Sequence, residues 1–88
     1  MLNTVALIGK LASAPTSAPL KDNFTHEIEV EVDGEKYPIW IWKGMADIIA
    51  DKYPIGTTLG IKASLKKYYG QLYIVASSIS FITEAEHD

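Results

Sequence analysis

The segment from Phe24 to Val32 alternates strictly between two kinds of side chain, and this alternation constrains the fold more than any other feature of the sequence. One face holds His26, Ile28, Val30 and Val32, and the other holds Glu27, Glu29 and Glu31. A period of two is typical of a half-buried β-strand. Asp33-Gly34 follows at once and favours a tight hairpin, so we predict a return strand from Lys36 to Trp42.

The rest of the chain predicts three further strands and one short helix. Thr4 to Leu11 is apolar and β-branched, which indicates a largely buried strand, and Gly9 within it indicates a bulge or a sharp bend. The stretch from Ala12 to Asn23 carries prolines and serines and is predicted to be a loop. Apolar residues recur at helical spacing from Met45 to Tyr53, before Pro54 and Gly56 end the helix. The last two predicted strands are Thr58 to Lys67 and Leu72 to Ile82, joined near Tyr69-Gly70-Gln71.

This order of elements, β-β-β-α-β-β, predicts a mainly all-β protein. A five-stranded OB-fold barrel with one short helix between strands 3 and 4 fits it best. An SH3-like barrel has no helix at this place, and a ferredoxin-like fold needs two helices. We expect one OB-fold domain over residues 1–83, followed by a short acidic end at residues 84–88.

Composition argues against catalysis. The sequence has no cysteine, and its two histidines, His26 and His87, are far apart, which excludes thiolate chemistry and a multi-histidine metal site within one chain. No serine has a histidine partner in a local motif, and no glycine spacing matches a phosphate-binding loop. We therefore expect no enzymatic activity and no cofactor. No apolar run approaches a membrane span and no secretory signal is evident, so a soluble cytoplasmic protein without a membrane partner is expected.

The charge is segregated along the chain. The net charge of −3 argues against a nucleic-acid partner, but three of the 11 acidic residues, Glu84, Glu86 and Asp88, lie at the very end. Without them the protein has 8 lysines and 8 acidic residues. Between Lys36 and Lys67 there are six lysines and only two aspartates, so this half of the domain is locally basic.

Two tryptophans fall on the face of the return strand opposite Ile39 and Ile41. If the isoleucines build the core, Trp40 and Trp42 face outward and form a binding surface. The alternative is that one tryptophan caps the core and that the tyrosines only cover their hairpin. Aromatic rings interleaved with lysines are what a single-stranded nucleic-acid platform requires, because bases stack on rings while lysines neutralise phosphates. The candidate binding residues are Trp40, Trp42, Tyr68, Tyr69, Tyr73, Lys10, Lys36, Lys43, Lys62, Lys66 and Lys67.

Five short motifs in the correct order resemble the bacterial and phage single-stranded DNA-binding proteins. Asn3-x-Val5-x-Leu7-Ile8-Gly9-Lys10-Leu11 looks like the opening of that family, and Ile41-Trp42-Lys43-Gly44-Met45-Ala46-Asp47 looks like its aromatic-Gly-Lys segment with Lys and Gly exchanged. The other likenesses lie in residues 24–30, 54–65 and 78–82. The resemblance implies base stacking by Trp42 and a basic contact by Lys10. The Asp33-Gly34 turn replaces a longer excursion of the family, and no acidic-hydrophobic tail tip is present, so no tail-mediated replication partners are expected.

These observations give two functional hypotheses. The first is sequence-independent binding of single-stranded DNA, in replication, recombination or repair, by aromatic stacking and lysine–phosphate contacts. The alternative is an OB-fold protein-interaction or primosome-type assembly module with weak or no DNA binding, which the acidic row at Glu27, Glu29 and Glu31 favours. We also expect a homodimer or homotetramer, in which the acidic row faces a lysine strip of a neighbouring subunit.

Overall fold

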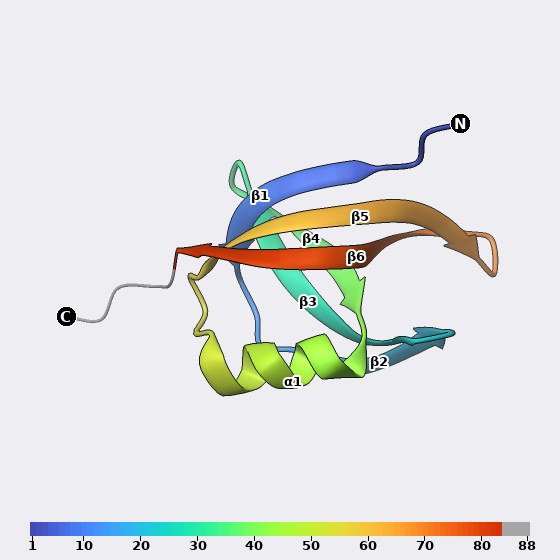
Figure 1. Ribbon diagram of the computed structural model, residues 1–88. Helices are drawn as coiled ribbons and strands as arrows, with labels where there is room; N and C mark the ends of the chain where they lie inside the picture. Colours follow the sequence, from blue (N-terminus) through green and yellow to red (C-terminus); the bar gives the residue numbers. More distant parts are fainter. Residues whose placement is uncertain (84–88) are drawn as a thin grey trace.

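The computed structural model describes residues 1–83 and shows a β-barrel with one helix packed across its lower side (Figure 1). The strands are β1 (Val5–Leu11), β2 (Thr16–Lys21), β3 (Phe24–Val32), β4 (Glu35–Ile41), β5 (Thr58–Tyr68) and β6 (Gln71–Thr83), and the helix is α1 (Lys43–Lys52). The prediction of a mainly β barrel with one helix is therefore confirmed. The acidic end predicted at residues 84–88 lies outside the described residues.

Five strands form a closed ring of hydrogen-bonded neighbours in the order β1-β5-β6-β4-β3, because β1 pairs with both β5 and β3. Strand β2 is added outside this ring and pairs with β3. The β4–β6 pairing is parallel and contains a single pair of partners, Trp40 and Val75, whereas the other pairings are antiparallel. The seam between β4 and β6 is therefore the weakest part of the barrel wall.

The barrel interior is filled by the aliphatic faces that the sequence alternation predicted. Ile28 and Val30 of β3 and Ile39 and Ile41 of β4 are each fully buried, while the glutamates of β3 fall on the outer face. Helix α1 adds Ala46 and Ile49 to this core. The other members of the core cluster are Leu11, Leu59, Ile61, Ala63 and Ala76. Each buried Ile, Leu or Val contributes about 1.5–3 kcal/mol relative to an exposed side chain, so the alternation of β3 and β4 supplies much of the stability.

Gly9 is required where β1 crosses β3 to close the ring. A Cβ placed at Gly9 would lie 2.5 Å from the backbone oxygen of Glu31 and 2.8 Å from methyl carbons of Val30 and Val32. The next residue, Lys10, pairs with both β5 and β3, so the chain changes partner immediately after this glycine. The glycine predicted to mark a bulge or bend thus serves close approach of two strands.

Two details of the sequence prediction are wrong. The segment Ala12–Asn23, predicted to be a loop, contains strand β2, so the sheet has six strands instead of five. Pro19 is compatible with β2 because this strand is at the edge of the sheet, where a residue without an N–H leaves no ladder bond broken. Helix α1 also begins at Lys43, two residues before the predicted start at Met45, because β4 ends at Ile41 and Trp42 caps the helix with its backbone.

We predict that Gly9→Ala destabilises the domain by about 2 kcal/mol or more, since overpacking against backbone cannot be relieved by a rotamer change. In a domain of this size that loss lowers Tm by roughly 8–16 °C, measured by thermal unfolding. Gly60→Ala is the matched control, because its Cβ would meet the exposed Ile82 side chain at 3.3 Å. Equal stability of the parent and Gly9→Ala proteins would contradict this account of barrel closure.

Candidate functional site

Three aromatic rings from three strands gather on the outer face of the barrel, and we call Trp40, Tyr68 and Tyr73 the aromatic cluster. The Trp40 and Tyr73 rings meet edge to face, with centroids 4.9 Å apart and planes at 85°. The Tyr68 and Tyr73 centroids are 6.0 Å apart with planes tilted by 37°. The Trp40 indole Nε1–H donates to the backbone oxygen of Ala18 at 3.1 Å, which fixes this half-buried ring across the outside of β3.

Strand register explains why these rings meet. Trp40 of β4 is the partner of Val75 in β6, and Tyr73 lies two residues from Val75 on the same face. Lys66 is the partner of Tyr73, and Tyr68 lies two residues beyond Lys66 on the same face of β5. The single β4–β6 pairing therefore joins the tryptophan to the tyrosines of the β5–β6 hairpin.

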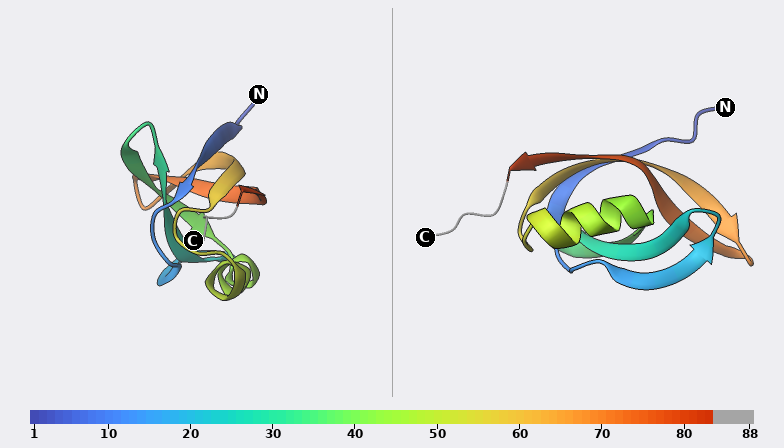
Figure 2. Two further views of the ribbon diagram at one scale, coloured as in Figure 1. Left: turned by 90° about the vertical axis from the view of Figure 1, so that its left-hand side faces the viewer. Right: turned by 60° about the horizontal axis from the view of Figure 1, so that its bottom comes forward.

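Lys21 is part of this site although the sequence analysis did not select it. Its Nζ atom lies 5.4 Å from the centroid of the Tyr68 ring, in a cation–π arrangement. Lys21 is the last residue of β2, and the β2–β3 and β5–β6 turns lie side by side at one end of the molecule (Figures 1 and 2). Lys21 could have been selected only if strand β2 had been predicted, because this strand places Lys21 beside the β5–β6 hairpin.

Tyr69 occupies an unusual backbone conformation at the tip of the β5–β6 hairpin. Its φ of 54° lies in the left-handed region, followed by Gly70 at 78°, and the Tyr69 side chain is 84% exposed. A bulky side chain in this region is strained, and Asn or Gly is the usual residue of such a turn. The same pair of positive φ angles occurs at Asp33-Gly34, with residues that suit it.

Trp42 does not lie on an open outer face as the strand alternation predicted. It is half-buried, packs against the core cluster and provides the N-cap backbone of α1, so the alternation of β4 ends at Ile41.

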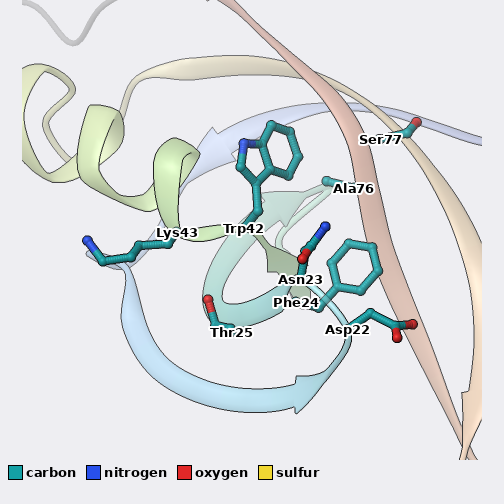
Figure 3. A pocket seen from close by; sticks show the side chains of 8 residues that line it. All are labelled: Asp22, Asn23, Phe24, Thr25, Trp42, Lys43, Ala76 and Ser77. Atoms are coloured by element: carbon teal, nitrogen blue, oxygen red, sulfur yellow. The ribbon is translucent and has the colours of Figure 1, made fainter.

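The Trp42 ring lines a pocket of about 450 Å³ next to the β4–β6 seam (Figure 3). The pocket is lined by Asp22, Asn23, Phe24, Thr25, Trp42, Lys43, Ala76 and Ser77. Lys43 on its rim forms an exposed ion pair with Asp47 at 2.9 Å.

The remaining predicted lysines are spread over several surfaces. Lys66 faces the same side as the aromatic cluster, whereas Lys67 pairs with Leu72 on the opposite face of the β5–β6 hairpin. Lys62 is exposed beside Ala6 and Ser78 on the β1–β5–β6 face. Lys10 and Lys36 both pair with Glu31, at the place where β1 pairs with β3. The structure thus brings only Lys66 among the predicted lysines directly to the aromatic cluster.

The acidic row lies on the same outer face as Trp40, and we call Glu27, Glu29 and Glu31 the acidic column. Glu27 is the strand partner of Trp40, Glu29 of Pro38 and Glu31 of Lys36. The face formed by β3 and β4 therefore carries negative charge along β3 and aromatic or positive side chains along β4. The carboxylates of this column repel a polyanion, which disfavours phosphate contacts along β3.

Other kinds of site find no support in residues 1–83. No group of three or more His, Asp or Glu side chains there could hold a metal ion. No helix in the same part of the chain has the length and hydropathy to cross a membrane.

Comparison with known proteins identifies the fold. No protein-family model matches the sequence, and no curated protein matches it. Among solved structures, the mitochondrial single-stranded DNA-binding protein Rim1 of S. cerevisiae superposes with a TM-score of 0.73 at 11% identity, over 97% of this chain and 98% of that one. The SSB domain of a Synechococcus protein gives 0.65 at 18% identity, over 90% and 94%. A chain of a replication protein A heterotrimer bound to single-stranded DNA gives 0.63 at 10% identity, over 94% and 60%. The protein thus has the OB-fold architecture of single-stranded DNA-binding proteins.

Proposed function

We propose that the protein binds single-stranded DNA without sequence preference along most of the strand, by stacking bases on the aromatic cluster. One observation carries this proposal: rings from β4, β5 and β6 converge beside Lys21 and Lys66 at the end of the barrel where two hairpin turns meet. Each stacked base contributes about 1–3 kcal/mol by alanine substitution, and stacking accepts any base.

The position of the cluster on the fold supports the proposal. OB-folds bind oligonucleotides on the face of their second and third barrel strands and between the loops that join strands 1–2 and 4–5. In this chain those features correspond to the β3–β4 face, to residues 12–23, which contain β2 and its turn into β3, and to the β5–β6 turn. The structural neighbours include single-stranded DNA-binding proteins of mitochondrial and bacterial type and a complex with single-stranded DNA. A role in replication, recombination or repair follows from this activity.

Few lysines flank the cluster, so the electrostatic part of binding is small. Lys21, Lys43 and Lys66 are the lysines near the aromatic cluster and the Trp42 pocket. Each phosphate neutralised on a single strand contributes about −0.7 to the slope of log K against log salt. Three contacts give a slope of roughly −2. The acidic column keeps phosphates away from β3, which further limits the slope.

The acidic column favours a second candidate function. Carboxylates one strand away from Trp40 and Pro38 attract a basic, partly apolar peptide, whereas they repel the phosphates of DNA. An OB-fold interaction or assembly module would use this face for a protein partner. DNA titration separates the two functions, because a protein-binding module shows weak or no DNA affinity even at low salt.

Self-association is a further part of the proposal. Strand β1 pairs with β3 only at Lys10 and Leu11, and Gly9 packs closely on β3, so within residues 1–83 the backbone edge of Val5–Ile8 away from β5 has no partner strand. Nearby, Ile8 is 69% exposed and Ile82 is 55% exposed. An open strand edge with apolar side chains is a template for pairing with a second copy. We expect light scattering to give a dimer or tetramer, whereas the monomer mass of 9.7 kDa at tens of micromolar would contradict it.

Titration of dT oligomers at several salt concentrations, followed by tryptophan fluorescence, tests the proposed function. Lys21→Ala should weaken binding about fivefold at low salt, the value of one unit charge pair in water, and reduce the salt slope by about 0.7. Lys67→Ala is the matched control and should change neither quantity, because Lys67 faces away from the cluster. Absence of binding at micromolar protein and low salt would contradict the proposal. Equal effects of Lys21→Ala and Lys67→Ala would show that the DNA does not bind preferentially on the side of the aromatic cluster.

Tyr69→Asn should separate stability from binding. Asn suits the left-handed conformation, so we expect the free energy of unfolding to rise by about 0.5–1 kcal/mol and Tm by a few degrees. Loss of a stacking ring at the hairpin tip should weaken dT binding by about fivefold. The control Asp33→Asn, at the same backbone conformation, should leave binding unchanged. Parent-level affinity of Tyr69→Asn would remove Tyr69 from the site.

A further inference from the structure

The pocket beside Trp42 exists because the barrel wall opens after one residue pair. Trp40 and Val75 form the single β4–β6 pair, and two residues later Trp42 is the N-cap of helix α1. Ala76, next to Val75, is small and buried and forms part of the pocket lining. Ser77 is an extra residue in β6, where the register with β5 shifts, and its hydroxyl donates to the Lys62 backbone oxygen at 2.9 Å. The pocket thus lies beside the seam on the interior side of β6, since Ala76 belongs to the core cluster, whereas Trp40 docks on the outer side.

The lining of the pocket suits a flat ring with a polar edge. Phe24 and Trp42 supply aromatic walls, and the volume of about 450 Å³ lies within the roughly 300–1,000 Å³ of small-molecule sites. In Figure 3 the Asn23 amide lies between the Trp42 and Phe24 rings in this view, while the Asp22 carboxylate points away from Trp42.

Asn23 is the rim side chain that is equipped to read a base. The Ser77 hydroxyl donates to the backbone oxygen of Lys62, and the Thr25 hydroxyl forms a hydrogen bond with the His26 ring at 2.8 Å. The Asn23 amide forms no hydrogen bond to any group within residues 1–83, so both its donor and its acceptor are available to a ligand. An amide pairs with adenine through two hydrogen bonds, accepting from the N6 amino group and donating to N7.

We propose that this pocket receives one unstacked base of a bound DNA strand and selects adenine there through the Asn23 amide. The inference rests on the proposed function, since the strand reaches the pocket from the aromatic cluster. Lys43 on the rim contacts the adjoining phosphate, because its exposed ion pair with Asp47 contributes little and is readily exchanged. The protein therefore binds most of the strand without preference but reads one position.

The experiment uses the shortest dT oligomer that binds, labelled for fluorescence anisotropy, with a single deoxyadenosine moved along it one position at a time. A short oligomer fixes the register, so one position should bind about fivefold more tightly than the others, the lower end for a bidentate amide–adenine pair. Replacing that adenine by unsubstituted purine, which lacks the N6 amino group, should abolish the gain. Asn23→Leu should flatten the profile, so that the oligomer with adenine at the favoured position binds no more tightly than plain dT.

Gln71→Leu is the matched control, since it removes an amide from the other hairpin, where its oxygen accepts from the Tyr73 hydroxyl at 3.1 Å. Whatever its effect on the overall affinity for dT, it should preserve the adenine peak. A flat profile in a protein that binds dT overturns the inference and leaves the proposed function standing. A peak that survives Asn23→Leu, or that persists with unsubstituted purine, also overturns it, because stacking area would then explain the preference. If no oligomer binds at all, the proposed function and this inference fail together.

Discussion

The close contact of β1 with β3 at Gly9 is the constraint on which the rest of the structure depends. Because Gly9 lacks a side chain, the two backbones approach closely enough for β1 to pair first with β5 and then with β3. This double pairing closes the ring and encloses the aliphatic faces of β3 and β4. The ring is closed on the other side by the β4–β6 pairing, which contains only one residue pair and is therefore its least hydrogen-bonded junction.

Trp40 and Trp42 both lie at that loose seam, and they contribute to it differently. Trp40 lies across the outside, held by the Ala18 oxygen and by the edge contact with Tyr73. A ring fixed in this way loses little conformational entropy when a base stacks on it. Trp42 packs on the core and leaves a pocket between itself and Phe24. The weakest place in the barrel wall is therefore also the place where Trp40, Tyr73 and Trp42 lie.

The parts of the fold that follow from side-chain period were predictable from the sequence, and the parts that depend on tertiary pairing were not. Alternation placed Ile39 and Ile41 in the core correctly. It failed at Trp42, because a period of two has no meaning beyond the last strand residue. Strand β2 was not predicted because Ser17 and Pro19 within it are typical of loops, and edge strands tolerate them. Lys21 was missed with it.

The lysines show the same limit at the candidate site. A count of charges along the chain could not reveal that Lys66 and Lys67 face opposite sides of the β5–β6 hairpin. Nor could it reveal that Lys10 and Lys36 lie on either side of Glu31, where β1 pairs with β3. Only the register of the assembled sheet decides which charges meet the rings. Likewise, the acidic column could be read as one strand face, but its position one strand away from Trp40 required the β3–β4 pairing.

The central claim is that single-stranded DNA stacks on the aromatic cluster at this seam, and the two indole N–H resonances test it most directly. A ¹⁵N-labelled protein has one such signal from Trp40 and one from Trp42, which single Trp→Phe variants assign. On titration with a short dT oligomer, the Trp40 signal should shift together with backbone amides of Lys21, Tyr68 and Tyr73. Shifts confined to the β1–β5–β6 face around Ile8 and Lys62, with the Trp40 signal unmoved, would contradict the account.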